Sequence, residues 1–387
     1  MRWSMASLRR DVRMVVDGLR GRHPPAVITS RISPVYPAVP DAGSAARART
    51  LEVVEVRRET ADAISLLLRD PTGRAIEVVP GQFFTVLVTV GGEELRRAYS
   101  ASSSPLVTDT VTLTVKRIAG GRVSSYLHDH AAPGLRLAVL GPSGDFTVAA
   151  DAAATRHVFA IAGGSGITPI MAITRAVLAV EPHSTVTVVY GNRDAAAIIF
   201  AAELDALAAA HPDRLRVRHV LEDAAGRPDA RAGRLDAATV GALIADAAPD
   251  ATFYVCGPEG MMAEARAALA ARAVPAARIR EERFTAPARR EVARTATAQP
   301  VTIRRAGVAL DVVVPPGATI LDAGLAAGVP LRLSCAMGGC GACAVTLTAG
   351  EVVMDEPNCL TDVERARGTI LACCARPLGP CTVEAAP

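Results

Sequence analysis

The sequence predicts a multidomain α+β and α/β fold: an antiparallel β-barrel, an α/β domain with a parallel sheet, and a small β-rich domain around a cysteine loop. A chain of 387 residues needs more than one hydrophobic core. Short β-rich runs separated by Gly, Pro and Asp turns fill residues 47–150, as in antiparallel barrels. In residues 151–285 apolar strands alternate with Ala-rich helical stretches, which is typical of a parallel sheet covered by helices. Short strands return in residues 300–387, on both sides of the cysteines.

The composition is that of an ordinary globular protein. Half of the residues are hydrophobic and 21% are charged. The 42 Lys and Arg nearly balance the 39 Asp and Glu, so the net charge of +3 gives no basic stripe and we expect no nucleic-acid partner. Gly, Thr and Pro interrupt every apolar run before the roughly 20 residues that a membrane span requires, so we expect no transmembrane segment. Eight cysteines in so long a chain indicate thiols in a reducing compartment, and we place the protein in the cytoplasm.

Two segments lack the pattern of a folded domain. Residues 1–46 begin with a basic stretch and continue into Pro-rich and small-residue runs, so we interpret them as an extension and linker. Apolar residues at helical spacing between Met5 and Leu19, with arginines on the other faces, predict a basic amphipathic helix. Such a helix could contact an anionic membrane peripherally or dock a partner, or it could pack on its own domain. Residues 286–299 are polar and basic without an apolar period, which predicts a second linker.

The strands of the first two domains are expected at definite places. In the barrel they are 51–56, 64–70, 83–90, 110–118 and 135–141. In the α/β domain they are 157–163, 185–191, 215–221 and 252–257.

The cysteines of the last domain have metal-ligand spacing. Cys335, Cys340 and Cys343 form C-x4-C-x2-C, and Cys373 follows thirty residues later, which is the plant-type pattern for a [2Fe-2S] cluster. Interleaved glycines let the loop turn its backbone N–H groups toward sulfur. A zinc site or a set of buried thiols are the alternatives. Cys374 is adjacent to the fourth ligand, but neighbouring residues point in different directions and we assign the ligand to Cys373.

These motifs carry a family resemblance. Residues 301–385, including ILACCARP around Cys373, resemble a plant-type ferredoxin, which implies a β-grasp domain. RAYSASS, from Arg97 to Ser103, resembles the RxYS flavin motif of the ferredoxin–NADP reductase family. The resemblance implies that Arg97 pairs with the FAD pyrophosphate, that Tyr99 packs against the flavin and that Ser100 hydrogen-bonds near N5. Ala98 lies within the same motif.

The segment VKRIAGGRVSSYLHDH is expected to complete the flavin site. Two glycines precede a predicted helix whose free N–H groups form an anion site, and in the family this segment favours FAD over FMN. A plain Gly-Gly turn before a capped helix is the alternative. The FAD contacts expected here are Val115, Lys116, Gly120, Gly121, Val123 and Ser124.

Three further segments predict a nicotinamide site. FAIAGGSGITPIMAI combines a strand, a Gly-rich turn and a helix start, and resembles the GGxGITP motif of the same reductases. YVCGPEGMM resembles their CGP segment, which places Cys256 beside the nicotinamide, although a buried thiol is the alternative. EERF matches the positions of a carboxylate, Glu282, and a ring over the flavin, Phe284. The expected dinucleotide contacts are Gly163, Gly164, Gly166, Thr168, Pro169, Arg193, Glu222, Cys256, Gly257 and Pro258.

NADH is the expected electron donor, with NADPH as the alternative. Arg193 ends a strand where it could meet a 2′-phosphate or simply the adenosine. Glu222 and Asp223 stand where NADPH-using relatives tend to have Ser-Arg. A carboxylate accepts a hydrogen bond from a free 2′-hydroxyl and repels a 2′-phosphate, so the pair favours NADH.

The order of flavin, nicotinamide and ferredoxin domains is similar to that of reductase components of multicomponent oxygenases, such as those serving 3-ketosteroid 9α-hydroxylase and phenylacetyl-CoA epoxidation. The resemblance implies electron transfer from NAD(P)H through FAD and the [2Fe-2S] cluster to a terminal oxygenase, hydroxylase or desaturase. Ser100, Cys256 and Glu282 would be the catalytic residues. A flavin diaphorase with a non-functional cluster domain and a membrane-recruited redox sensor are the alternatives.

Overall fold

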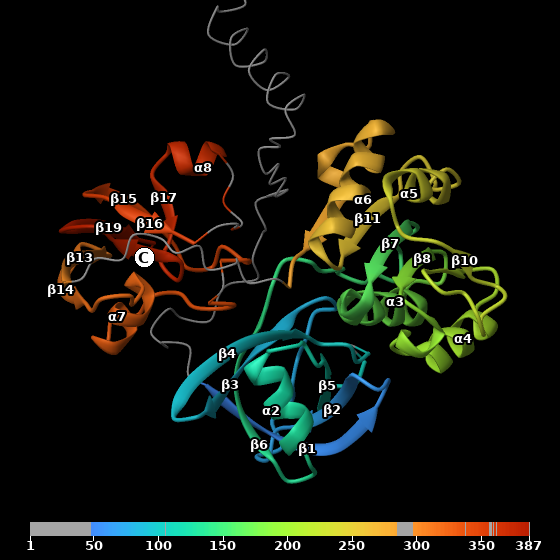
Figure 1. Ribbon diagram of the computed structural model, residues 1–387, viewed down its shortest axis with the longest axis horizontal. Coiled ribbons are helices and arrows are strands. Elements are labelled where there is room, and N and C mark those ends of the chain that lie inside the picture. Colours follow the sequence, from blue (N-terminus) through green and yellow to red (C-terminus); the bar gives the residue numbers. More distant parts are fainter. Residues whose placement is uncertain are drawn as a thin grey trace, which may run out of the picture.

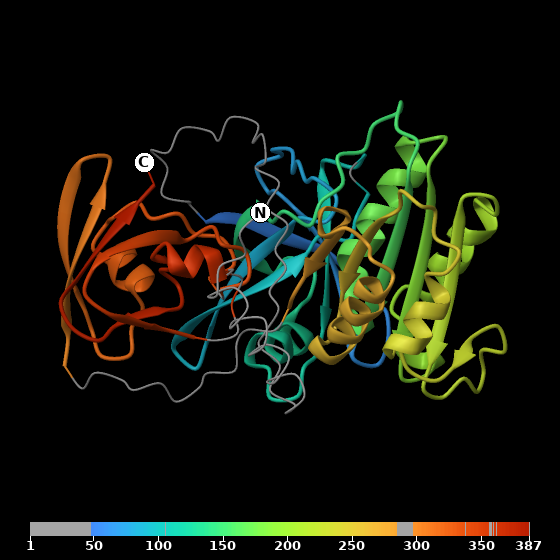
Figure 2. The ribbon, with the colours of Figure 1, turned by 90° about the horizontal axis from the view of Figure 1, so that it is seen from above.

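The computed structural model describes residues 48–104, 106–284, 297–336, 338–355, 358, 360 and 362–386. Figures 1 and 2 show three units, with the first one in contact with both of the others. The predicted N-terminal helix and most of the predicted second linker lie outside the described residues. Among the described residues, no helix is long and apolar enough to cross a membrane.

The first unit is a curved six-stranded antiparallel sheet in the order β4-β3-β6-β1-β2-β5. An antiparallel bridge between Ala101, just after β4, and Leu113 of β5 brings the two edges of the sheet together. Side chains such as Leu66 and Phe84 are buried inside. The RAYS segment forms the end of β4, which is not among the strands expected from the sequence. The elements are β1 (Arg49–Arg58), β2 (Ala63–Arg69), β3 (Phe83–Val90), β4 (Glu93–Ser100), β5 (Thr110–Lys116), α2 (Arg122–His130) and β6 (Arg136–Ser143).

The second unit is a parallel six-stranded sheet in the order β10-β9-β8-β7-β11-β12, as its alternating pattern predicts. Helices α3 and α4 cover one face and α5 and α6 the other, and each face has its own apolar core (Figure 2). Its strands are β7 (His157–Gly163), β8 (Thr185–Asn192), β9 (Leu215–Leu221), β10 (Arg231–Ala232), β11 (Thr252–Cys256) and β12 (Ile279–Glu282). Its helices are α3 (Ile167–Val180), α4 (Ala201–Ala210), α5 (Ala237–Leu243) and α6 (Glu259–Ala271), with short 3-10 turns η1 (Gly164–Gly166), η2 (Ala195–Ala197) and η3 (Ala276–Arg278).

The third unit is a mixed five-stranded sheet in the order β14-β13-β19-β15-β17, with helix α7 packed against β14. A short pair, β16 with β18, flanks it (Figure 1). The elements are β13 (Gln299–Arg305), β14 (Val308–Val314), α7 (Ile320–Ala326), β15 (Ala344–Ala349), β16 (Val352–Met354), α8 (Asp362–Ala366), β17 (Thr369–Leu371), β18 (Ala375–Pro377) and β19 (Cys381–Ala385).

Buried polar contacts join the units. The hydroxyl of Thr85 on β3 donates to the carbonyl oxygen of Ser334 in the cysteine loop at 2.9 Å. The hydroxyl of Tyr254 on β11 donates to the carbonyl oxygen of Thr147 at 3.0 Å, and its ring packs edge-on against Phe146. A buried polar group without a hydrogen-bond partner costs free energy, so these contacts favour the observed packing of the units against one another.

A buried ion pair secures the end of α3, and its loss should destabilise the protein. Glu181 is fully buried and accepts from two nitrogens of Arg156 at 2.7 and 3.0 Å. We expect Glu181→Ala to lower the free energy of unfolding by about 3 kcal/mol, because it leaves a partly buried guanidinium without its partner. Glu55→Ala, which removes an exposed ion pair with Arg57, should cost less than about 1 kcal/mol. Urea denaturation would measure both, and equal shifts would contradict the prediction.

We expect protonation of His157 to reduce the stability of the protein in mild acid. Its Nδ1 accepts from the N–H of Ala248 at 3.1 Å, so the neutral ring donates from Nε2 to the Thr187 hydroxyl at 3.0 Å. Burial lowers the pKa of His157 below its ordinary 6.5. At pH values between the lowered pKa and 6.5, His157 is more often protonated in the unfolded chain than in the folded one. The free energy of unfolding therefore has its full value above pH 6.5 and decreases as the pH falls through this range.

The measurement is the melting temperature at pH 7 and pH 5. His157→Gln should show a smaller difference between the two than the wild type, because it has no proton to take up at this position. His183→Gln alters an exposed ring and should keep the wild-type difference. Identical pH dependence in His157→Gln and wild type would count against the prediction.

Candidate functional site

Several predicted site residues lie at the carboxyl ends of neighbouring parallel strands. Cys256 of β11 pairs in register with Ala162 of β7 on one side and with Glu282 of β12 on the other. The glycine loop begins directly after Ala162. Ligands of open parallel sheets bind at this edge. The strand register therefore brings Cys256, Glu282 and the loop together, as the motifs predicted.

The glycine loop and the CGP segment are in very close contact. A Cβ on Gly166 would lie 2.0 Å from the carbonyl oxygen of Cys256, and one on Gly163 would lie 2.8 Å from Pro258 Cδ. A Cβ on Gly257 would lie 2.9 Å from the Gly163 nitrogen. A Cβ on Gly166 or Gly257 would meet backbone atoms, and one on Gly163 would meet the side chains of Met261 and Pro258. None of these positions has room for a side chain, so the two segments form one continuous surface.

The start of α3 uses its predicted residues for packing. Thr168 and Pro169 are both buried, and the Thr168 hydroxyl donates to the carbonyl oxygen of Ser165 at 3.0 Å. Gly164 has a positive φ of +51°. This geometry leaves the backbone of the loop, rather than these side chains, to meet a ligand.

A partly buried hydrogen bond links the barrel to the α/β sheet. Ser100 Oγ, at the end of β4, donates to Glu282 Oε2 at 3.1 Å. Burial raises the pKa of Glu282 to about 8, with a smaller opposing effect of Ser100 and a further increase from Cys340. At neutral pH this carboxyl therefore carries a proton. Burial, together with Glu282, also raises the pKa of the Cys256 thiol, which stays uncharged.

The RAYS segment presents alternate side chains to different surroundings. Tyr99 is half-buried against the barrel core, and burial raises the pKa of its phenol. Arg97 is exposed and donates one guanidinium hydrogen bond to the carbonyl oxygen of Arg96 at 2.7 Å. An exposed guanidinium fork next to a ring suits a phosphate ester with an aromatic group. Ala98 lies between them on β4.

The second predicted flavin segment forms a loop before α2. Gly120 has a φ of +71°, and the Ser124 hydroxyl donates to the carbonyl oxygen of Gly121 and accepts from the N–H of Ile118. Val123 is buried in the barrel core, so only its backbone, near the N-terminus of α2, faces a ligand. Free N–H groups at this terminus favour an anion.

Val115 and Lys116, also predicted to contact FAD, point in different directions. Val115 is fully buried in the barrel core. Lys116 Nζ lies 3.7 Å from the place of a Cβ on Gly164, so this side chain faces the glycine loop of the α/β domain.

The residues expected to select the dinucleotide also come together. The Asp223 N–H donates to the carbonyl oxygen of Arg193 at 2.7 Å, which joins the loops after β8 and β9. Glu222 Oε1 forms an ion pair with Arg234 Nε at 3.1 Å. Phe284, just after β12, packs against the core beneath α3.

The four predicted cluster ligands occur as two pairs. Cys335 lowers the pKa of Cys340, and Cys343, followed by Cys374, raises the pKa of Cys373, so the two thiols of each pair lie next to one another. No three His, Cys, Asp or Glu side chains within the described parts of the chain surround one point where a single metal ion would bind. Two pairs of thiols suit two irons. Cys374 Sγ lies 3.6 Å from Cys373 Sγ, beside the ligand set.

The cysteine loop lies against the Ser100–Glu282 pair. A Cβ on Gly339 would be 3.9 Å from the carbonyl oxygen of Arg283, and Cys340 influences the pKa of Glu282. The Thr85–Ser334 hydrogen bond attaches the same loop to β3. All three units therefore meet near Glu282.

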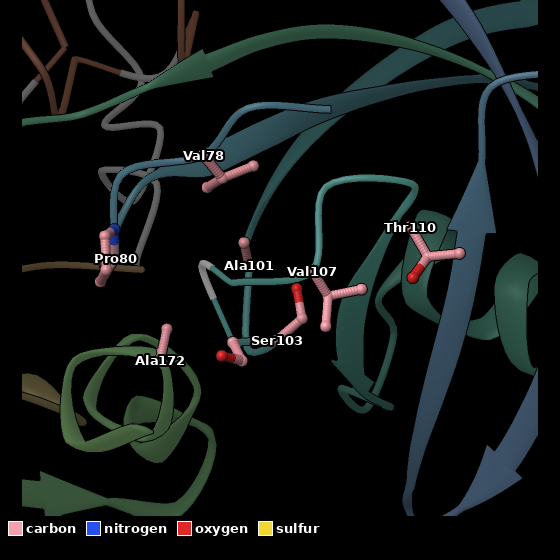
Figure 3. A pocket seen from close by; sticks show the side chains of 8 residues that line it. Val78, Pro80, Ala101, Ser103, Val107, Thr110 and Ala172 are labelled. Carbon is pink, nitrogen blue, oxygen red and sulfur yellow. The ribbon is translucent and has the colours of Figure 1, made fainter. Parts of the chain in front are cut away.

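Figure 3 shows a pocket between the barrel and α3. Its lining residues are Val78, Pro80, Ala101, Ser103, Ser104, Val107, Thr110 and Ala172. It adjoins the end of β4 but includes none of residues 97–100.

Two residues at the junctions were not anticipated from the sequence. Thr85 holds the cysteine loop, and Asp62, in the turn after β1, lies near both Lys116 and Arg193. Each is an ordinary polar residue whose partner is distant in sequence, so no local motif marks it.

Comparison with known families agrees with this geometry. Residues 50–148 match the oxidoreductase FAD-binding domain, residues 160–267 the oxidoreductase NAD-binding domain, and residues 303–378 the 2Fe-2S iron-sulfur cluster binding domain. The predicted cofactors FAD, NADH and a [2Fe-2S] cluster are thereby confirmed.

Individual relatives are similar over most of the chain. The ferredoxin reductase component of 3-ketosteroid-9-alpha-monooxygenase from Mycobacterium tuberculosis is 40% identical over 346 residues, covering 84% of this chain and 92% of the relative. One of the subunits of 1,2-phenylacetyl-CoA epoxidase from Escherichia coli is 35% identical over 338 residues, covering 85% of this chain and 95% of the relative.

A solved structure confirms the fold class. Phthalate dioxygenase reductase has a TM-score of 0.60 at 22% identity, covering 87% of this chain and 98% of that structure. The likeness covers all three units. The chain therefore belongs to the family of FAD- and NAD-binding oxidoreductases with a C-terminal [2Fe-2S] domain that serve as reductase components of oxygenase systems.

Proposed function

We propose that this chain passes electrons from NADH to a terminal oxygenase, hydroxylase or desaturase. The observation that carries the proposal is the meeting of the Ser100–Glu282 hydrogen bond, the glycine loop and the cysteine loop at one edge of the sheet. When bound, FAD and the [2Fe-2S] cluster supply the redox chemistry, which converts a two-electron donor into single electrons. The names of the relatives support an oxygenase as acceptor.

The chain's own residues would position and protect this chemistry. The protonated Glu282 would offer a hydrogen-bond donor near the predicted flavin N5, and Ser100 holds this carboxyl by donating to Glu282 Oε2. Cys256 is fully buried at the adjacent strand end, and we assign it to the nicotinamide side of the site. Exclusion of water by these residues would limit side reactions with solvent.

The binding residues are assigned by the same logic. Arg97 and the N-terminus of α2 would hold the FAD phosphates, and Tyr99 and Phe284 would flank its ring. Gly163, Gly164, Gly166 and the CGP segment would form the dinucleotide surface. Cys335 and Cys340 would bind one iron, and Cys343 and Cys373 the other.

The limits of the domains and the location of the protein are part of the proposal. We keep 47–150, 151–285 and 300–387 as the functional domains, with linkers at 1–46 and 286–299. Four thiolates that must stay reduced favour the cytoplasm. The membrane contact predicted for residues 1–46 lies outside the described residues, and no comparison supports it.

An anaerobic titration tests the function. NADH should bleach the flavin absorbance and then produce the electron paramagnetic resonance signal of a reduced [2Fe-2S] cluster. NADPH should reduce the flavin more slowly, because the Glu222 carboxylate repels its 2′-phosphate. Flavin reduction with an oxidised or absent cluster would instead support the diaphorase. Failure of both nucleotides to reduce the flavin would contradict both functions.

Substitution of single cysteines tests the ligand set. Cys373→Ser should abolish or strongly reduce the cluster signal while flavin reduction by NADH persists, because the cluster loses one of four thiolates. The control is Cys381→Ser, another buried thiol of the same domain, which should keep the wild-type iron content. Iron analysis and electron paramagnetic resonance measure the result. A full cluster in Cys373→Ser would contradict the assignment.

A further inference from the structure

One carboxylate of the barrel lies between two cations at the junction with the α/β domain. Asp62 Oδ2 is 3.6 Å from Lys116 Nζ and 3.8 Å from Arg193 Nη2. Lys116 ends β5 of the barrel, whereas Arg193 follows β8 of the α/β domain. Asp62 therefore makes one ion pair within its own domain and one across the junction. We call Asp62, Lys116 and Arg193 the Asp62 cluster.

The barrel holds the Asp62 carboxylate in place. The hydroxyl of Thr60 donates to Asp62 Oδ1 at 2.8 Å, and the N–H of Arg117 donates to the Asp62 carbonyl oxygen at 2.7 Å. Its side chain is 32% exposed, and Arg193 is 70% exposed. The carboxylate is thus oriented by its own turn, while its partner from the other domain, Arg193, is mostly exposed to solvent.

The Asp62 cluster stands beside the glycine loop. Lys116 Nζ is 3.7 Å from the place of a Cβ on Gly164, whose carbonyl oxygen accepts from the Tyr190 hydroxyl at 2.9 Å. The loop leads into the 14-residue helix α3, whose N-terminal N–H groups favour an anion. Two cations and a helix terminus next to a glycine loop are suited to a pyrophosphate.

We propose that Asp62 competes with the pyrophosphate of the nicotinamide dinucleotide for Lys116 and Arg193. The inference rests on the proposed function, because it takes the ligand at this loop to be that dinucleotide. In the free protein the carboxylate offsets the repulsion between the two cations and joins the domains. When the pyrophosphate binds, its oxygens replace the carboxylate as partners of the cations, and the remaining negative charge of Asp62 weakens binding. Asp62 thus sets the affinity low enough for the oxidised dinucleotide to leave.

The test uses ADP-ribose, which carries the pyrophosphate but has no nicotinamide to react. Its dissociation constant for the FAD-loaded protein would be measured by isothermal titration calorimetry. Asp62→Asn should tighten binding about threefold to tenfold, as expected for the removal of a partly exposed charge near a charged ligand. Lys116→Met, compared at equal FAD occupancy, should weaken binding by a similar factor. FAD content also reports whether each variant folds.

A matched control and a combined variant separate this mechanism from a general change of charge. Glu55→Gln removes one ion-paired carboxylate from the same barrel, outside the Asp62 cluster, and should leave the constant unchanged. In a Lys116→Met/Arg193→Met background, Asp62→Asn should no longer tighten binding, because the cations it occupies are gone. Asp62→Ser, which removes the charge with a smaller side chain, should reproduce the gain.

Three outcomes would overturn the inference. Unchanged or weaker binding by Asp62→Asn and Asp62→Ser would show that the carboxylate does not compete. If Asp62→Asn still tightened ADP-ribose binding in the Lys116→Met/Arg193→Met background, the carboxylate would not act through these two cations. A gain seen only with 2′-phospho-ADP-ribose would contradict the pyrophosphate assignment. No binding of either probe to the wild type would count against the proposed function itself, whereas the first three outcomes would leave that function intact.

Discussion

The hydrogen bond between Ser100 and Glu282 is the contact on which the arrangement of the site depends. One partner ends a strand of the barrel and the other ends a strand of the parallel sheet, so neither domain alone can bury it. Burial raises the pKa of Glu282 to about 8, which keeps a proton on the carboxyl at neutral pH. If the two domains moved apart, water would enter and that proton would be lost. The chemistry of the site is therefore a property of the domain junction.

The glycine loop, the CGP segment and the cysteine loop also meet at this junction, and the first two can do so because backbone packs directly against backbone there. Gly166 lies so close to the Cys256 carbonyl oxygen that any side chain would separate α3 from β11. The cysteine loop is attached by the Thr85 hydroxyl and lies next to Glu282. The predicted flavin, dinucleotide and cluster sites consequently lie at one edge of the sheet, and electron transfer requires short separations of this kind.

Charged groups in this protein have different roles according to their burial. Glu181 is fully buried and pairs with the partly buried Arg156, which secures the end of α3. The Asp62 cluster is partly exposed and lies where an anionic ligand would enter. Removing the first leaves an uncompensated charge in a poorly solvated place. Changing the second alters how strongly a ligand competes for the cations. Similar ion pairs thus stabilise the fold in one place and bear on binding in another.

The sequence by itself determined the three-part fold class, the order of the domains and the expected cluster ligands. The short β-rich runs, the alternation of apolar strands with helical stretches and the C-x4-C-x2-C spacing before Cys373 are all patterns of residues close together in the sequence. They can therefore be recognised without the structure. Glu282 was placed from a motif, but its raised pKa follows from burial by another domain. Lys116 was assigned to FAD from its own segment, and only the packing of β5 against the glycine loop showed that it faces Gly164. Thr85 and Asp62 carry no local signal, because their partners are distant in sequence. Tertiary structure decided these contacts because their partners meet only once the chain has folded and, for most of them, once the domains have docked.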